Sequence, residues 1–169
     1  MSTIENPTGA TAVPPPLPAT LRLGPVHLTV SDLDRSIRFY ERSLGLGLQR
    51  RDGDTAAIGA GGEDLVVLVE QPAAQPAGRH AGLYHFALLF PTREELAHAV
   101  LRLAETRTHI EGASDHGVSE AIYLRDPDDN GIELYVDRPQ EDWPHAPDGE
   151  GVAMFNAPLD LQALLAEAG

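Results

Sequence analysis

Hydrophobic and polar positions along the chain alternate first with a strand period and then with a helix period, and this succession occurs twice. Residues 24–30 (GPVHLTV) and 82–88 (GLYHFAL) are short runs of apolar, β-branched and aromatic residues, each with a histidine in fourth place. Each run precedes a segment with helical spacing of apolar residues and then three further strand-like runs. The pattern therefore predicts two consecutive βαβββ modules.

Both predicted helices begin at residues that can accept hydrogen bonds from the first helical amides. Ser31-x-x-Asp34 opens the first helix, and Thr92-x-x-Glu95 has the pattern of a capping box at the start of the second. The apolar residues that share one helix face are Leu33, Ile37, Tyr40 and Leu44 in the first helix and Leu96, Val100 and Leu103 in the second. Each helix therefore has one face to bury.

The strands that follow the helices are separated by glycine turns, among them Asn130-Gly131. They are predicted at 46–51, 55–60 and 64–70 in the first module and at 108–111, 118–125 and 131–137 in the second. We expect an α+β domain over residues 21–139, built from modules at 22–72 and 81–139. The two modules are expected to form a curled mixed sheet around a shared metal-binding cleft.

The two ends of the chain have loop composition. Residues 1–20 are rich in Pro, Thr and Ala, which bury too little apolar surface to offset the entropy of ordering, so we expect a disordered tail. Residues 140–169 form a C-terminal extension, in which 159–165 (LDLQALL) predicts a short amphipathic helix.

Composition excludes several classes of function. The net charge is −14, all basic residues are arginines, and there is no cysteine. The charge argues against nucleic-acid binding, and the chain lacks the lysine of a P-loop and the thiolates of a zinc–cysteine site. No apolar run is long enough to cross a membrane and the N-terminus lacks the features of a secretory signal, so a cytoplasmic protein is expected.

Two of the seven histidines occupy equivalent places in the repeat. His27 and His85 lie 58 residues apart, each within an otherwise apolar strand. A buried histidine without a partner is costly, so a metal between the two is an economical explanation. The alternative is a pair of core histidines, each bonded to a carbonyl. Four others, which we expect to be ordinary solvated side chains, are His80, His98, His109 and His145.

Glu133 is the third candidate metal ligand. Strand alternation places Ile132 and Leu134 on one face and Glu133 on the other, so a carboxylate lies in the middle of an apolar strand. Two histidines and a carboxylate form the facial arrangement that holds non-haem Fe(II) and leaves positions open for substrate and dioxygen.

Glu70 is the alternative acidic ligand, which would be a fourth. When the final strands of the modules are aligned on Pro72 and Pro139, Glu133 corresponds to Val66. The repeat therefore predicts three protein ligands. A short shift in strand register would turn Glu70 inward and add the fourth.

Three motifs together resemble the vicinal oxygen chelate superfamily, which includes glyoxalase I, extradiol ring-cleaving dioxygenases and the fosfomycin and bleomycin resistance proteins. They are VHLTVSDLDRSIRFYERSLGL, GLYHFALLFP and LRDPDDNGIELY. The resemblance covers about residues 22–139. It implies a metal bound from the first strand of each module and the last strand of the second, which here means His27, His85 and Glu133.

A further segment, His116-Gly-Val-Ser followed by Tyr123-Leu-Arg-Asp-Pro, is similar to the catalytic segment of catechol extradiol dioxygenases. That resemblance implies His116 as an acid/base on bound oxygen and Tyr123 as a hydrogen-bond partner of the substrate. The chain is most similar to the N-terminal half of catechol 2,3-dioxygenases.

The reaction that the resemblance implies is ring cleavage of a catechol-like substrate with O2. The expected cofactor is Fe(II), with Mn, Ni or Zn as alternatives, and the expected assembly is a homodimer. Two other readings stay open: a glyoxalase-type isomerase or antibiotic-modifying thiol transferase, which needs Glu70 as a ligand, and a metal-free drug-binding resistance protein.

Overall fold

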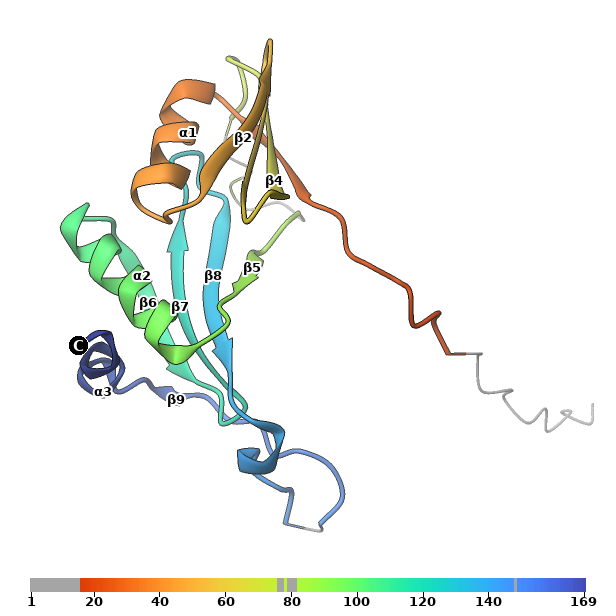
Figure 1. The fold of residues 1–169 in the computed structure, drawn as a ribbon, viewed down its shortest axis with the longest axis vertical. Helices are drawn as coiled ribbons and strands as arrows, with labels where there is room; N and C mark the ends of the chain where they lie inside the picture. The colour runs from red at the N-terminus through yellow and green to blue at the C-terminus, as the bar shows by residue number, and fades with distance from the viewer. Residues whose placement is uncertain (1–15, 76–77, 79–81, 148) are drawn as a thin grey trace, which may run out of the picture.

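Two βαβββ modules follow one another along the chain, as the repeat predicts (Figure 1). The computed structural model describes residues 16–75, 78, 82–147 and 149–169. The first module consists of β1 (Val26–Val30), α1 (Leu33–Arg42), β2 (Gly47–Asp52), β3 (Thr55–Ala60) and β4 (Glu63–Glu70). The second consists of β5 (Phe86–Leu89), α2 (Arg93–Glu105), β6 (Ile110–Asp115), β7 (Ser119–Arg125) and β8 (Gly131–Asp137). The α+β fold class is thereby confirmed.

Each module forms a sheet of its own. The first sheet has the order β1-β4-β3-β2, with β1 parallel to β4, and the second has the order β5-β8-β7-β6-β9, with β5 parallel to β8. Beyond the modules, the chain continues through η1 (Gln140–Asp142), β9 (Ala157–Pro158), α3 (Leu161–Leu165) and η2 (Ala166–Ala168). No strand of one sheet pairs with a strand of the other in the described residues, so each module keeps a separate open sheet.

The helices begin close to the predicted caps. Thr92 caps α2 by accepting a hydrogen bond from the amide of Glu95. In α1 the cap is Asp32, one residue later than the Ser31 pattern predicts, and it accepts from the amide of Arg35. Ser31 has a different partner, because its amide and hydroxyl both donate to Asp128 of the second module.

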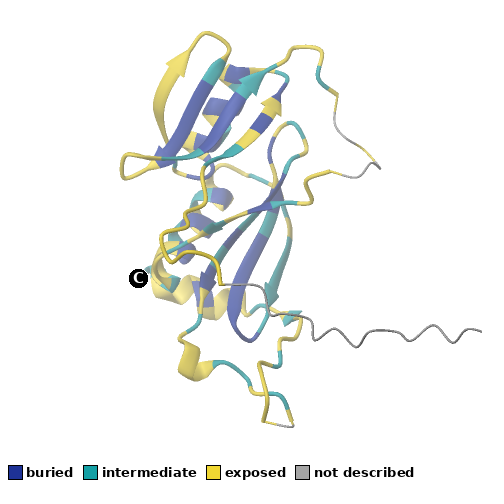
Figure 2. Ribbon diagram, turned by 90° about the vertical axis from the view of Figure 1, so that its right-hand side faces the viewer, coloured by how far each residue is buried: buried dark blue, intermediate teal, exposed yellow. Residues whose placement is uncertain are grey.

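One hydrophobic core joins the modules. Buried residues of α1, α2, α3 and both sheets belong to a single cluster, and the helices lie on the core side of the sheets. The opposite face of each sheet carries no helix. Figure 2 shows buried residues concentrated in the central strands, whereas all of β2 is exposed.

The strand boundaries agree with the prediction except in β5 and β6. β5 begins at Phe86, so His85 lies just before the strand and not within it. β6 continues to Asp115 instead of ending at residue 111, and its last two residues pair with both β7 and β9. The predicted C-terminal helix is present as the shorter α3. Of the predicted N-terminal tail, residues 1–15 lie outside the described residues.

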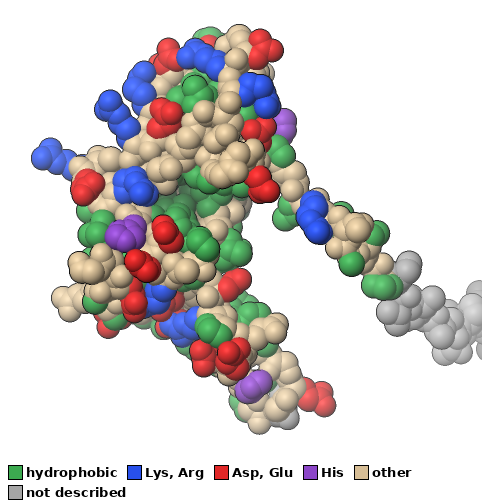
Figure 3. Space-filling view, in the orientation of Figure 1, with side chains coloured by type: hydrophobic (Ala, Val, Ile, Leu, Met, Phe, Trp, Pro, Cys, Tyr) green, Lys and Arg blue, Asp and Glu red, His purple; other side chains and the backbone are tan. Residues whose placement is uncertain are grey.

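Charged side chains of both signs lie on the face of the molecule that Figure 3 shows. In the view of Figure 3, arginines gather over the first module and acidic side chains are spread between them. In the described part of the chain, no helix is both long and apolar enough to span a bilayer.

Candidate functional site

His85 and Glu133 lie together on the face of the second sheet that carries no helix. β5 and β8 are parallel neighbours, with Ala87 opposite Glu133, and His85 directly precedes β5. The His85 Nε2 atom lies 2.9 Å from Glu133 Oε2, and the two side chains are 29% and 14% exposed. Strand alternation in β8 is as predicted, since Ile132 and Leu134 are buried in the core on the other face.

Tyr123 and His116 extend this pair into a hydrogen-bonded cluster. Tyr123 lies opposite Glu133 in the pairing of β7 with β8, and its hydroxyl is 2.9 Å from Glu133 Oε1. The Nε2 atom of His116 lies 2.8 Å from the same hydroxyl. The structure therefore brings together four of the five residues predicted for the site.

The electrostatic environment keeps the Tyr123 phenol protonated. Burial raises the pKa of Tyr123 well above its ordinary value, and the hydrogen bond and negative charge of Glu133 raise it further. A protonated phenol has one hydrogen to donate, so it can donate either to Glu133 or to His116. The hydroxyl of Tyr123 can thus switch its hydrogen bond from a carboxylate to an imidazole.

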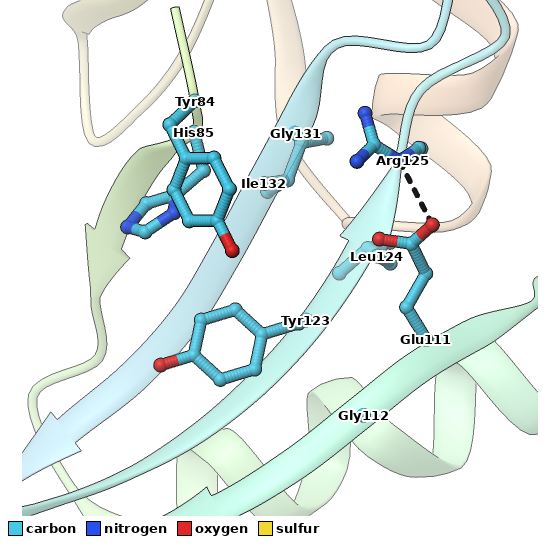
Figure 4. A pocket seen from close by; sticks show the side chains of 9 residues that line it. All are labelled: Tyr84, His85, Glu111, Gly112, Tyr123, Leu124, Arg125, Gly131 and Ile132. Atoms are coloured by element: carbon cyan, nitrogen blue, oxygen red, sulfur yellow. Dashed lines mark hydrogen bonds and ion pairs between the residues drawn. The ribbon is translucent and has the colours of Figure 1, made fainter.

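A cavity of about 220 Å³ lies beside the cluster (Figure 4). Tyr84, His85 and Tyr123 line this space with their rings near one another, and Tyr84 and His85 have ring centroids 5.0 Å apart. Glu111 and Arg125 form an ion pair at its rim, with Arg125 Nε 2.8 Å from Glu111 Oε1. Sequence analysis did not single out Tyr84, although its position directly before His85 was a signal that could have found it.

His27 stands apart from this cluster. It lies in β1, opposite Val67 of β4, and its side chain is exposed. It lines a different cavity, together with Thr29 and Asp128. Across the described ranges, no three His, Asp or Glu side chains are grouped so that they could hold a metal ion.

The prediction that both histidines are buried is therefore wrong for His27 within a single chain. The reason is the shared core: each sheet turns its helix-bearing face toward that core, and the faces that carry His27 and His85 are left uncovered. The repeat predicts the equivalent place of each histidine but not the relative orientation of the modules.

Glu70 is bound on the helix side of its strand. Its Oε1 atom accepts a hydrogen bond from the Leu33 amide at 2.8 Å, at the beginning of α1. It follows Val69, whose neighbour across the sheet is Thr29. In the structure the carboxylate thus accepts a hydrogen bond from the first turn of a helix, where negative charge is favoured.

The strand register also corrects the alignment of the repeat. Thr29 and Ala87 each follow their module's histidine by two residues, and they pair with Val69 and Glu133, respectively. Glu133 therefore corresponds to Val69 and not to Val66. Because Val69 is also apolar, the expectation of three protein ligands is unaffected, and Glu70 faces the opposite side of the sheet.

The remaining histidines divide as follows. His109 and His145 are exposed, in agreement with the prediction, His98 is partly exposed, and His80 lies outside the described residues. Phe155 is a contact of His116 that sequence analysis missed, because no local pattern relates two residues so far apart in the chain.

Comparison with known proteins finds similarity to two proteins named as dioxygenases. The chain is 43% identical over 150 residues to a catechol-2,3-dioxygenase of Bacillus subtilis, covering 87% of this chain and 52% of the relative. It is 39% identical over 56 residues to a biphenyl-2,3-diol 1,2-dioxygenase of Rhodococcus globerulus, covering 33% of this chain and 30% of the relative. The chain thus spans about half the length of the first relative and matches a smaller part of the second.

A crystal structure with the same fold is a glyoxylase/bleomycin resistance protein/dioxygenase domain from Frankia. It is 26% identical, has a TM-score of 0.61, and matches 70% of this chain and 98% of its own. The family profile of the Glyoxalase/Bleomycin resistance protein/Dioxygenase superfamily matches residues 22–134. By fold, repeat and sequence, the chain belongs to the Glyoxalase/Bleomycin resistance protein/Dioxygenase superfamily.

Proposed function

We propose that the chain is an extradiol-type ring-cleaving dioxygenase that acts on a catechol-like substrate with O2. The observation that carries the proposal is the Tyr123 hydroxyl, which lies within hydrogen-bond distance of both Glu133 and His116. The similarity to a protein named catechol-2,3-dioxygenase over most of the chain supports the same reaction.

The donor set suits a divalent metal, most suitably Fe(II), with Mn, Ni or Zn as alternatives. His85 Nε2 and the Glu133 carboxylate already face each other, and an imidazole with a carboxylate is the combination that non-haem Fe(II) prefers. We assign His27 as the third ligand and propose that a second copy of the chain supplies it, because His27 lies on the uncovered face of the first sheet.

When bound, the metal would hold the catechol oxygens and dioxygen side by side, which is a contribution of proximity. His116 would act as the general acid/base, an effect worth about 100- to 10,000-fold in rate. Tyr123, held protonated by its surroundings, would donate a hydrogen bond that orients a substrate oxygen. The tyrosine-lined cavity beside His85 offers aromatic faces for a small ring to stack on.

The isomerase and thiol transferase readings are less well supported. They need a fourth ligand, and the carboxylate of Glu70 is bonded to the Leu33 amide on the other side of its strand. A metal-free drug-binding protein would have no use for the His85–Glu133 pair. The homodimer and the cytoplasmic location stay predictions.

Oxygen uptake tests the proposal. The protein is loaded anaerobically with Fe(II) and exposed to O2 with a small panel of catechols. We expect uptake with a yellow ring-cleavage product, lost in His85→Ala and kept in His98→Ala, whose histidine is partly exposed on α2. Metal binding without uptake would contradict the dioxygenase and favour the isomerase or transferase. Absence of metal binding would favour the drug-binding protein.

A further inference from the structure

The C-terminal extension contacts the loop that carries His116. β9 pairs with the end of β6, with Ala157 opposite Asp115. The contact then continues past the strand, because the Phe155 amide donates to the His116 carbonyl at 3.3 Å. This part of the chain lies beyond residues 22–134, the range matched by the superfamily.

The His116 imidazole is held between two oxygen atoms. Its Nδ1 atom lies 3.3 Å from the Phe155 carbonyl oxygen, and its Nε2 atom lies 2.8 Å from the Tyr123 hydroxyl. A carbonyl oxygen only accepts hydrogen bonds, so Nδ1 must carry a hydrogen for this contact to be favourable. In the neutral imidazole, Nε2 then has no hydrogen of its own, so the single hydroxyl hydrogen of Tyr123 must turn from Glu133 to Nε2.

The Phe155 ring packs against Gly117, and this contact helps to hold the Phe155 backbone in place. Gly117 has φ +78°, and a Cβ atom there would lie 2.6 Å from the Phe155 ring and 2.9 Å from Pro144. The ring therefore packs directly over the glycine that follows His116. The Ala153 amide donates a 2.8 Å hydrogen bond to the Pro144 carbonyl, which ties these two parts of the extension together.

We propose that Phe155 is a positioning residue for His116. Its carbonyl selects the Nδ1–H tautomer and turns Nε2 toward Tyr123, and its ring holds the extension over Gly117 so that the carbonyl stays in place. The extension thereby serves the chemistry of the site as well as the stability of the fold. This inference rests on the proposed function only where it concerns catalysis.

The tautomer is measured directly by long-range 1H–15N NMR of the full-length chain labelled with 15N-histidine. Spectra are recorded with and without diamagnetic Zn²⁺, above the ordinary imidazole pKa of about 6.5. His116→Asn identifies the signals of His116. We expect the Nδ1–H form in the wild type and in Phe155→Tyr, and a mixture of both tautomers in Phe155→Ala.

Met154→Ala is the matched control, because Met154 precedes Phe155 in the extension and is 64% exposed. It should leave the His116 signals unchanged. Should Phe155→Ala not fold, Phe155→Leu keeps an apolar contact but lacks the ring edge over Gly117, and we expect a mixture there as well. An unchanged Nδ1–H signal in the folded Ala or Leu variant would overturn the proposal.

Turnover of the Fe(II)-loaded enzyme provides a second measurement. Misplacing a catalytic group by about 1 Å can cost on the order of 100-fold in rate, so we expect kcat in Phe155→Ala to fall about 10- to 100-fold. KM and Fe(II) affinity should change far less, and Phe155→Tyr should restore kcat. A tautomer that depends on Phe155 in a protein without dioxygenase activity would uphold the positioning role and contradict the proposed function.

Discussion

At the scale of single residues, strand parity decides what two nearby carboxylates do. Glu133 follows the buried Ile132 and faces the open side of the second sheet, where it meets His85. Glu70 has the opposite parity relative to its module's histidine and faces α1, where it accepts from the Leu33 amide. A shift of one position thus separates a candidate metal ligand from a helix cap.

Glu70→Gln tests this assignment. The amide oxygen of glutamine can still accept from Leu33, but the favourable charge at the helix N-terminus is lost, so we expect the free energy of unfolding to fall by about 0.5–1 kcal/mol. Fe(II) affinity should be unchanged. Denaturant unfolding and metal titration measure the two effects, and Glu63→Gln, an exposed position of the same strand, is the control.

A collapse of Fe(II) affinity in Glu70→Gln would contradict the three-ligand site. It would favour the four-ligand chemistry of an isomerase or transferase.

The repeat and strand alternation were sufficient to predict His85 and Glu133, whereas Tyr123 and His116 were implied only by the resemblance to catechol extradiol dioxygenases. All four residues lie within one module. The repeat was not sufficient for His27, since a repeat shows where each residue lies in its module and not how the modules face each other. The alignment on the two prolines failed because they follow strands that end at different registers.

At the scale of secondary-structure elements, the turn between β7 and β8 anchors α1. Asp128 accepts from the Ser31 amide and hydroxyl at 3.1 and 2.6 Å and pairs with Arg35 at 2.8 Å. Buried Asp126 accepts from the hydroxyl of Tyr40, which is fully buried in α1. The sequence predicts this turn from its Asn-Gly pair. The contact between the turn and α1 could not be predicted, because it joins residues of different modules that are 97 positions apart.

Asp128→Asn should reveal a pH-dependent part of the stability. Burial alone would raise the pKa of Asp128, but the hydrogen bonds from Ser31 and the charge of Arg35 outweigh it and lower the pKa below its ordinary 3.8. The carboxylate therefore stabilises the fold above about pH 4, and this stabilisation is lost as the pH falls through the lowered pKa.

We expect Asp128→Asn to lose about 1–2 kcal/mol of unfolding free energy at neutral pH. The difference from the wild type should shrink as the pH falls below the ordinary carboxyl pKa of 3.8 and through the lowered pKa of Asp128. Urea unfolding at several pH values measures both. Asp129→Asn, in the same turn but more exposed, should change the free energy by less than about 0.5 kcal/mol. An equal loss at every pH would argue against the ionised Asp128 as the cause.

At the scale of the whole molecule, the chain carries two incomplete halves of the proposed metal site. His27 lies on the uncovered face of the first sheet, and His85 with Glu133 lies on that of the second. In a dimer with a twofold axis, His27 of each copy would meet His85 and Glu133 of the other copy, which gives two equivalent sites.

Mixing two inactive variants tests this arrangement. His27→Ala keeps His85 and Glu133, and Glu133→Ala keeps His27, so a mixed dimer contains one intact site. If copies combine at random, we expect co-refolded protein to regain about a quarter of the wild-type oxygen uptake and a matching share of bound Fe(II). Light scattering measures the oligomeric state of each sample.

The variants refolded separately are the control and should stay inactive. A mixture without activity or bound metal would show that the ligands do not combine between chains. A monomer in light scattering would contradict the dimer itself.

The short strand β9 limits how copies of the chain can join. It covers the outer edge of β6 and ends in Pro158, which has no amide hydrogen to offer another strand. The second sheet is therefore closed to extension on that side, and β5 is its free edge, as β1 and β2 are in the first sheet. At the β9 edge of the second sheet, another chain therefore cannot easily add a strand and start an aggregate. The edge strands β1 and β5 stay open, and they lie next to His27 and His85.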